Sequence, residues 1–404
     1  MPGSAPWERG QGPVAGDNPR PRVGLGVVVI RWLAGFCVPC GLRRISGMTT
    51  SPDASVATRR PAGDAATSHS GAGSDFAGLS RRIAAAGLLK RRPGYYTVRL
   101  GLVTGSFAAA WAAFLLLGDT WWQLVVAAFL ALVFGQVALV AHDLAHGQVF
   151  RRRRHSEIGG RLFGNLGIGM SYGWWMNKHT RHHAHPNHEE LDPDVAPDIL
   201  VWSAEQARSS TGPARLIGGR QALLFFPLLT LEGFNLHVAG VRALRSPFMK
   251  NRLLEGALLL LHCAAYLSAL FLVLSPGKAV AFLVVHQCLF GVYLGCTFAP
   301  NHKGMPTITG EQRLDFLRRQ VLTSRNVRGG RFTDAMLGGL NYQIEHHLFP
   351  SMPTVHLRRA RVIVRQYCAE IGVPYHETGL IRSYREALTH LHRVGEPIRR
   401  RHGA

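Results

Sequence analysis

Long apolar runs alternate with basic and polar segments along the chain. Four of these runs approach the ~20 residues needed to cross the hydrocarbon core of a membrane, and they lie at residues 101–118, 121–141, 253–274 and 279–299. Only a few polar residues separate the first run from the second and the third from the fourth. The pattern therefore predicts an all-α integral membrane protein with four transmembrane helices in two hairpins.

Two shorter apolar stretches, at residues 162–176 and 223–236, fall below the length of a full span and contain polar residues. Such stretches are typical of helices that lie at the membrane interface or dip into it. Together with the polar segments beside them, they predict a helical cap on one side of the four spans.

The charge distribution predicts on which side this cap lies. The chain has 46 Lys plus Arg against 24 Asp plus Glu, a formal net charge of +22. The basic residues gather before the first span and between the two hairpins, whereas the two short turns carry only Lys278. Because loops rich in Lys and Arg stay in the cytoplasm, the cap and both termini are expected there.

The same composition excludes other classes of protein. A content of 47% hydrophobic and 17% charged residues is too apolar for a wholly disordered chain. The arginines flank the spans, and no basic-aromatic module typical of nucleic-acid binding is present. Attraction to anionic lipid headgroups explains the basic segments, so we expect membrane lipid and no nucleic acid as a partner.

The two ends of the chain differ from the apolar middle. Residues 1–80 are rich in Gly, Ser, Ala and Pro and predict a disordered extension. Met48 opens a segment that looks like an ordinary protein start, so we interpret 1–47 as an overlong start assignment. The membrane domain is expected at residues 81–386 and a basic C-terminal tail at 387–404.

Histidines form the main candidate site. Three clusters and one single position on the same predicted side of the membrane contain His142 and His146; His179, His182 and His183; His302; and His346 and His347. Spacings of i, i+3 and i+4 bring side chains to one face of a helix. Eight imidazoles are too many for one ion, but two metals would receive four nitrogens each. Imidazole suits Zn, Cu, Fe and Ni, so the spacing alone does not name the metal.

These motifs resemble a known family. HxxxH, HxxHH and QxxHH around two hairpins are similar to the three histidine boxes of the integral-membrane fatty acid desaturases, and the likeness covers residues 81–386. Longer matches are His179-Thr-Arg-His-His-Ala-His-Pro-Asn187, Asp192-Pro-Asp194, Asn301-His-Lys-Gly304 and Asn341-Tyr-Gln-Ile-Glu-His-His-Leu-Phe-Pro350. Gln343, in the first position of the third box, resembles the front-end branch of the family.

The resemblance implies a non-haem di-iron centre that uses O2, with the eight histidines as metal ligands. Gln343 would ligate weakly, hold a water or hydrogen-bond a ligating imidazole, and these alternatives stay open. Other polar residues near the boxes are expected to orient the ligand rings or to form a turn. They are His185, Asp192, Asp194 and Asn301.

The implied function is an oxidoreductase that places a cis double bond in an acyl chain linked to CoA, a carrier protein or a lipid. Many members of the front-end branch carry a fused cytochrome b5 domain with a His-Pro-Gly-Gly motif, which this sequence lacks. Electrons are therefore expected from a separate donor, such as a ferredoxin, a flavoprotein reductase or a cytochrome b5-like protein.

Two other functions stay open. A membrane hydroxylase or monooxygenase of alkyl chains would use similar boxes, and the spacing does not separate it cleanly from a desaturase. A histidine-rich membrane metal carrier belongs to another class, and it would place His, Asp or Glu along a path within the spans. His262 and His286 are the only histidines in the middle of a predicted span.

Overall fold

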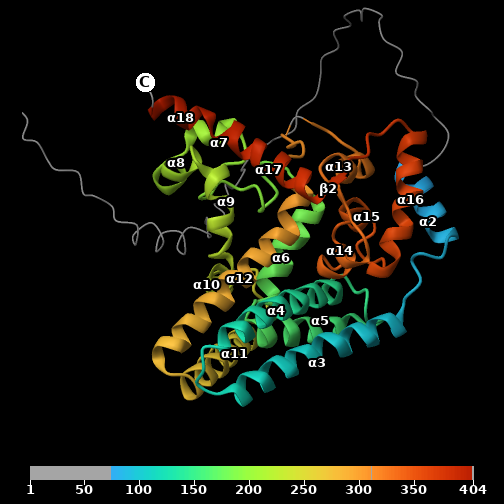
Figure 1. The fold of residues 1–404 in the computed structure, drawn as a ribbon. Coiled ribbons are helices and arrows are strands. Elements are labelled where there is room, and N and C mark those ends of the chain that lie inside the picture. Colours follow the sequence, from blue (N-terminus) through green and yellow to red (C-terminus); the bar gives the residue numbers. More distant parts are fainter. Residues whose placement is uncertain (1–73, 311, 403–404) are drawn as a thin grey trace, which may run out of the picture.

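A computed structural model describes residues 74–310 and 312–402, and Figure 1 shows their arrangement. The interpretation of residues 1–47, and that of the predicted extension as far as residue 73, lie outside the described residues. The described part is mostly helical. Its long helices form the lower half of the molecule in Figure 1, and the shorter helices gather above them.

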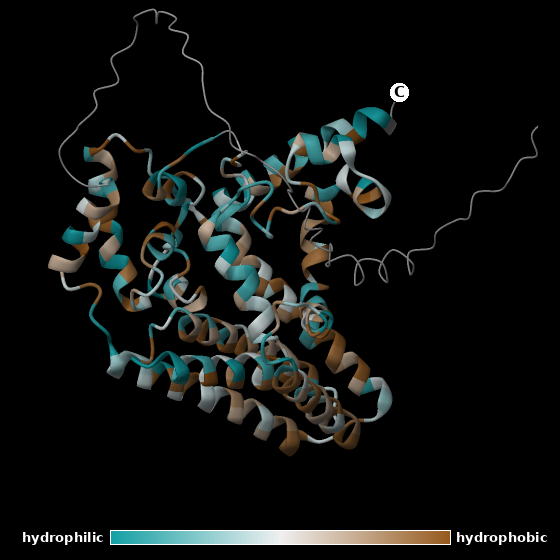
Figure 2. Cartoon of the chain, turned by 180° about the vertical axis from the view of Figure 1, so that it is seen from behind, coloured by the Kyte–Doolittle hydropathy of each residue, from teal (hydrophilic) through white to brown (hydrophobic). Residues whose placement is uncertain are grey.

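Four helices are long and apolar enough to cross a membrane, as predicted from the four apolar runs. They are α3 (Pro93–Leu117), α4 (Gln123–Ala145), α11 (Arg252–Val273) and α12 (Pro276–His302). Hydrophobic colour is concentrated on this layer in Figure 2, while the layer of short helices is mixed. α4 packs against both α3 and α12 and is the most enclosed of the four.

The observed helices continue beyond the apolar runs. α4 extends to Ala145 and α12 to His302, each roughly one turn further than the hydropathy pattern predicts. The helical hydrogen bonds therefore persist through residues that are polar, and Pro300 lies inside α12. These last turns place two of the histidine segments directly at the ends of membrane-spanning helices.

The two shorter apolar stretches are each broken into two elements. Residues 162–176 form a π-helix, η1 (Leu162–Gly167), and the start of α6 (Tyr172–Ala184), rather than one helix. Gly169 stands between them with a φ of 69°, a left-handed conformation that favours glycine. Ser171 then begins α6, because its side chain accepts a hydrogen bond from the Trp174 amide.

The second stretch contributes to α9 (Gln221–Leu229) and α10 (Glu232–Ala243), which meet at a bend of 74°. By length and composition this pair has the form of a broken span or a re-entrant loop. α10 packs closely on α12. At Gly291 a Cβ would lie 2.4 Å from the Leu229 carbonyl oxygen, so only glycine permits this approach.

The remaining helices are short or amphipathic, and all except α5 (Arg153–Arg161), which packs on α4 and η1, gather above the long helices in Figure 1. The others are α2 (Asp75–Ala85), α7 (Ala204–Ser209), α8 (Gly212–Gly218), α13 (Phe316–Leu322), α14 (Arg331–Met336), α15 (Gln343–Leu348), α16 (Thr354–Glu370), α17 (Leu380–Val394) and α18 (Glu396–His402). Two three-residue strands, β1 (Asn326–Arg328) and β2 (Glu377–Gly379), pair in parallel. The described residues are mostly helical, as predicted, and this short ribbon, which the sequence did not predict, joins segments distant in sequence.

The structure corrects both predicted end segments. The extension assigned to 1–80 is wrong from Asp75 onward, because α2 buries Leu79 and Ile83 completely in a core shared with α13, α15 and α16. The tail assigned to 387–404 begins inside α17, and α18 packs against α7. Leu391 and Ile398 are buried there, so this segment is packed amphipathic helix over its described length.

Candidate metal centre

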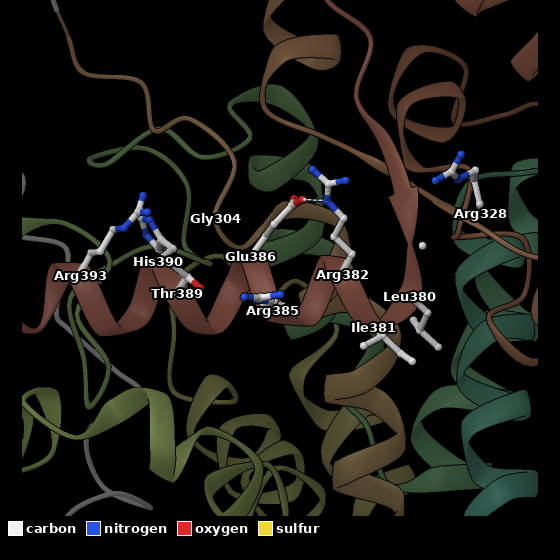
Figure 3. A pocket seen from close by; sticks show the side chains of 11 residues that line it. Gly304, Arg328, Leu380, Ile381, Arg382, Arg385, Glu386, Thr389, His390 and Arg393 are labelled. Carbon is white, nitrogen blue, oxygen red and sulfur yellow. Dashed lines mark hydrogen bonds and ion pairs between the residues drawn. The ribbon is translucent and has the colours of Figure 1, made fainter.

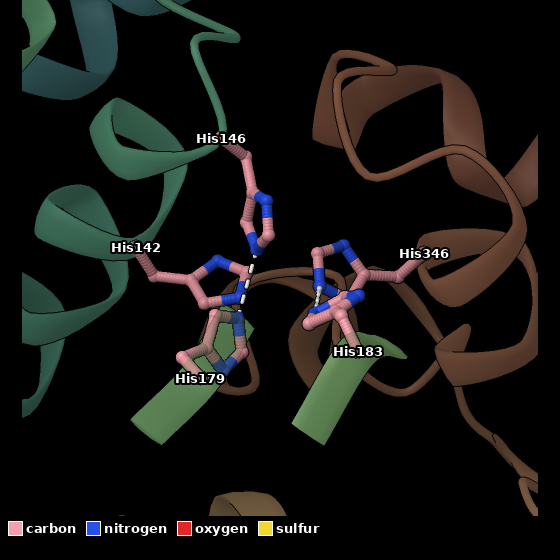
Figure 4. Close-up of side chains that lie close together, drawn as sticks. All are labelled: His142, His146, His179, His183 and His346. Carbon is pink, nitrogen blue, oxygen red and sulfur yellow. Dashed lines mark hydrogen bonds between the residues drawn. The ribbon is translucent and has the colours of Figure 1, made fainter. Parts of the chain in front are cut away.

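The predicted histidines meet in two groups where α4, α6, α12 and α15 converge. The first group draws from α4 and the residue after it, from α6 and from α15, and Figure 4 shows its five rings turned toward one space. One ring nitrogen of each lies within 4.8 Å of the others, and the members are His142, His146, His179, His183 and His346. The second group joins α6, α12 and α15 through His182, His302 and His347.

Hydrogen bonds fix which nitrogen of each ring in the second group carries the proton. His302 Nδ1 lies 3.1 Å from the Thr323 carbonyl oxygen. His347 Nδ1 lies 2.9 Å from Gln320 Oε1, and His182 Nδ1 lies 2.9 Å from Asp192 Oδ2. Because these oxygens are acceptors, each Nδ1 donates, and in the neutral ring each Nε2 keeps an unprotonated lone pair.

Three such lone pairs face one another. His302 Nε2 lies 3.3 Å from His182 Nε2 and 3.2 Å from His347 Nε2. With the protons held on Nδ1, no hydrogen bond is available between these nitrogens, and all three rings are at most 5% exposed. A cation held between them would satisfy all three acceptors, so the donor set fits a metal site.

The first group also presents unsatisfied nitrogens. Neither ring nitrogen of His142 has a hydrogen-bond partner among the described residues, although the side chain is buried. His146 Nε2 and His179 Nε2 are 2.8 Å apart, and His183 Nε2 and His346 Nε2 are 3.2 Å apart. Five imidazoles surround one space, and among their described nitrogens the nearby Asp143 carboxylate pairs only with His142 Nδ1, at 3.6 Å, so the facing ring nitrogens again fit a bound cation.

Burial keeps most of these imidazoles neutral, the state that a metal ligand requires. Burial, and then the proximity of other histidines, lowers the pKa of five rings well below the ordinary value: those of His146, His179, His183, His346 and His347. Their lone pairs are therefore available at neutral pH without the removal of a proton.

His182 differs because two carboxylates lie beside it. Burial lowers its pKa, but Asp192 and Asp194 together raise it above the ordinary value. Lys178 Nζ lies 2.9 Å from Asp194 and holds the pKa of that carboxyl well below its usual range, against the effect of burial. The carboxylates thus hold the Nδ1 proton of His182 and orient its Nε2 toward the second group.

The eight histidines divide five and three in space, not four and four as the sequence predicted. The two groups adjoin, because the rings of His183 and His347 stack with centroids 4.2 Å apart. Gln343 faces the smaller group, with Nε2 2.9 Å from His302 Nε2. Its amide nitrogen is therefore in place to donate a hydrogen bond to this imidazole, while its Oε1 accepts from Asn301. Sequence spacing could not give the partition, since it depends on how four helices meet.

Among the other predicted residues, some contact the histidine groups or Gln343, and one lies apart from them. Asn301 donates to the Leu340 carbonyl and to Gln343 Oε1, so it joins the end of α12 to the third histidine box. Asp192 and Asp194 contact His182, as described above. His185 lies outside both groups, where its ring approaches that of His188.

Sequence reasoning missed a buried polar segment that supports the centre. Gln320 accepts from His347 Nδ1 and donates to the His183 carbonyl oxygen, 3.0 Å away. Arg325 is fully buried and donates to the carbonyl oxygens of Pro300 and Lys303 on either side of His302. The available signal was a run of polar residues at 323–326, but none of these is a usual metal ligand.

Replacing Gln320 by leucine is expected to weaken metal binding by about 10–100-fold, because it removes the acceptor that orients His347. Metal retained against increasing chelator, measured on the purified protein, checks this. The matched control is Gln366→Leu on α16, whose exposed amide contacts only Glu370 in the described structure. Equal metal retention in both variants would remove Gln320 from the support of the centre.

The chain resembles known proteins over most of its length. Residues 119–379 match the family described as fatty acid desaturase. An acyl-lipid (9-3)-desaturase from Physcomitrium patens is 30% identical over 326 residues, which cover 78% of this chain and 61% of that protein. The Delta(6)-fatty-acid desaturase fat-3 from Caenorhabditis elegans is 30% identical over 291 residues, 69% of this chain and 66% of that protein. Fatty acid desaturase 3 from Bos taurus is 30% identical over 314 residues, 74% of this chain and 68% of that protein. This chain thus spans just under two thirds of the first two relatives.

Proposed function

The chain belongs to the fatty acid desaturase family, and from this membership we propose that it is an O2-dependent desaturase that introduces a cis double bond into a lipid- or CoA-linked acyl chain. The observation that carries the proposal is the meeting of eight histidines from four helices in two adjoining groups. These groups would hold two iron ions. Gln343 would complete the smaller group as a weak ligand or a hydrogen-bond donor.

The chemistry requires a metal because no amino-acid side chain can oxidise an unactivated methylene group. When bound, two irons supply the oxidising power for that step. The overall reaction converts CH2–CH2, O2, two electrons and two protons into CH=CH and two waters. Two of the four electrons that reduce O2 therefore come from the acyl chain and two from a donor.

The residues of this chain position and shield the centre. Thr323, Gln320 and Asp192 each hold the Nδ1 proton of one ring in the smaller group and aim its Nε2 inward. His346 and His347 are each 1% exposed, so packing around α15 excludes bulk water. A dry, oriented ligand set favours oxidation of the acyl chain over loss of the oxidant to solvent.

The proposed topology places two hairpins, α3 with α4 and α11 with α12, across the membrane. The cap, the centre and both termini then face the cytoplasm, because the basic residues between α4 and α11 outnumber the single Lys278 of the opposite turns. A separate cytoplasmic donor, such as a ferredoxin, a flavoprotein reductase or a cytochrome b5-like protein, would deliver the electrons.

Lipid analysis tests the function. The protein, expressed from Met48 with a compatible donor in a host lacking the activity, is expected to yield acyl chains with a new double bond, mapped by mass spectrometry. His182→Ala should abolish that product. A hydroxylated chain in its place would assign the protein to the oxygen-inserting alternative, and an unchanged lipid profile despite bound iron and an active donor would contradict the proposal.

The metal-carrier alternative gains no support from the described spans. His286 Nδ1 lies 2.7 Å from the Tyr266 hydroxyl, and His262 Nδ1 lies 2.8 Å from the Leu166 carbonyl oxygen. Among the described residues, each group of side chains able to hold a metal includes residues of α6 at the histidine centre. The mid-span histidines therefore do not extend the centre into a path across the membrane.

A further inference from the structure

Glu345 is a fully buried acidic residue in the third histidine box, between Gln343 and His346. On α15, Gln343, His346 and His347 share one face, because they are spaced at i, i+3 and i+4. Glu345 follows Gln343 by two residues, a rotation of about 200°, so its side chain leaves the opposite face of the helix. The carboxylate therefore lies outside both histidine groups.

A closed triangle of hydrogen bonds surrounds this carboxylate. Asn326 Nδ2 donates to Glu345 Oε2 at 2.7 Å, and the Tyr375 hydroxyl donates to Glu345 Oε1 at 2.8 Å. Asn326 Nδ2 also donates to the Tyr375 hydroxyl at 2.6 Å, and Asn326 Oδ1 accepts from the Ile344 amide at 3.0 Å. Burial of a carboxylate is costly unless it is hydrogen-bonded, and a polar network in which each group has a partner is rigid.

The β1–β2 ribbon brings Asn326 and Tyr375 together. Asn326 is the first residue of β1 and pairs with Glu377 of β2, and its amide donates to the His376 carbonyl oxygen at 3.0 Å. Tyr375 precedes β2 by two positions. At the other end of the ribbon, Arg328 lies beside the start of α17 (Figure 3). The pairing of two segments distant in sequence therefore supplies both donors to Glu345.

Glu386 of α17 holds the ribbon in place. Its Oε2 lies 2.8 Å from Arg325 Nη1 and 3.0 Å from His376 Nε2. Arg325 precedes Asn326 and His376 follows Tyr375, so one carboxylate binds a chain neighbour of each donor. Figure 3 shows Glu386 projecting from α17. The two donors are therefore fixed by a segment other than α15.

An acidic residue in the first turn of a helix ordinarily stabilises the helix through its dipole, and Glu345 stands in that turn of α15. However, α15 has only six residues, and a helix of that length is not stable on its own. Both carboxylate oxygens accept from side chains of other segments. These contacts determine where α15 lies and in which direction its opposite face points.

We propose that Glu345 is a positioning residue of the metal centre: with Asn326 and Tyr375, it fixes α15 so that the other face of the helix points into the centre. This inference rests on the proposed function and extends it to a residue outside both histidine groups. A small rotation of so short a helix would displace Gln343, His346 and His347 together. Partners that orient metal ligands typically contribute about 10–100-fold to metal affinity, and an effect of this order is expected here.

Metal retention against increasing chelator, measured on the iron-loaded full chain, tests the proposal. Tyr375→Phe removes one hydroxyl from the triangle and should weaken metal binding by about tenfold. Glu345→Leu removes both acceptors and should weaken it at least as much, whereas Glu345→Gln keeps an acceptor for Asn326 and should retain most of the affinity. The matched control is Tyr384→Phe, because the Tyr384 hydroxyl donates to the Cys296 carbonyl oxygen at 2.6 Å, outside the triangle.

Two further measurements separate positioning from general stability. Residues of one network have non-additive effects, so adding Tyr375→Phe to Glu345→Leu should cost no further metal affinity. Mössbauer spectra of the bound iron should change in Tyr375→Phe and stay unchanged in Tyr384→Phe. In the metal-free protein, amide hydrogen exchange across residues 343–348 should be faster in Glu345→Leu than in the wild type, which reports the loss of orientation without any metal.

A purely structural role gives a different result. A lower melting temperature in Tyr375→Phe, with metal affinity and iron spectra equal to those of Tyr384→Phe, would overturn the proposal. Additive losses of metal affinity in the double variant would also overturn it, because they would show that Glu345 and Tyr375 act separately.

Failure of this inference is distinguishable from failure of the desaturase proposal. Metal affinity and amide exchange are measured without turnover, whereas new double bonds are measured in host lipids. Full metal affinity in Glu345→Leu and Tyr375→Phe, in a chain whose wild type makes double bonds, would contradict the positioning role alone. Weakened metal binding in both variants of a chain that makes no double bond with an active donor would support the positioning role and contradict the desaturase function.

Discussion

Replacing His183 by alanine is expected to lower acyl desaturation by at least about 100-fold, since a ligand contributes more than the outer partners whose loss costs 10–100-fold. His183 stands at the junction of the two histidine groups: its Nε2 faces His346 at 3.2 Å, and its ring stacks on His347. The truncation opens a gap between the groups and removes a neutral imidazole from the first. Double-bond yield and bound metal, measured on the same preparations, check the result.

The matched control for this variant is His155→Ala, which removes an exposed histidine from α5 outside both groups. Expression level and melting temperature should match for the two variants, so that a difference in activity reports on the centre. Full activity and unchanged metal content in His183→Ala would show that the ring is not a ligand.

Replacing Arg325 by leucine is expected to destabilise the fold by about 3 kcal/mol, the lower end of the cost of breaking a buried ion pair. Arg325 is fully buried, and its guanidinium binds Glu386 and three carbonyl oxygens, those of Pro300, Lys303 and Ser383. Leucine removes the guanidinium donor from the three carbonyl oxygens. Glu386 is partly exposed and keeps its ion pairs with Arg382 and His376. The loss of stability should therefore stay below the upper end of the cost of breaking a buried ion pair.

A loss of that size corresponds to a fall in melting temperature of roughly 5–10 °C for a domain of a few hundred residues. Thermal unfolding in detergent, followed by circular dichroism, measures it. Arg365→Leu, at an exposed position of α16, should unfold at the wild-type temperature. A melting temperature of Arg325→Leu equal to that of this control would contradict the role assigned to the buried guanidinium.

The sequence predicted the membrane-spanning part of the fold well because a span needs a long apolar run, and such runs are visible directly. Their ends were less accurate, since α12 continues past the apolar run through Pro300 and Asn301 to His302. The short β1–β2 ribbon depends on a pairing between residues about 50 positions apart, Asn326 with Glu377. The sequence did not predict α2, because its buried face has only a few apolar side chains in a segment rich in small residues.

The sequence predicted which histidines gather at the candidate site, but it did not predict how they are arranged. All eight histidines come together, and their role as ligands remains a prediction. The division into five and three depends on the tertiary meeting of α4, α6, α12 and α15. The sequence also did not predict the hydrogen bonds by which Gln320, Thr323 and Arg325 support the centre. Their acceptors are largely backbone carbonyl oxygens, which any sequence would provide.

Metal stoichiometry tests the central claim most directly. The full chain, purified in detergent after growth with iron, should contain two iron ions per chain by mass spectrometry of the elements, and Mössbauer spectra should show both in nitrogen-rich, non-haem environments. Zinc in place of iron in a protein that is active with its donor, or a single ion per active chain, would contradict a two-iron centre built from these eight histidines.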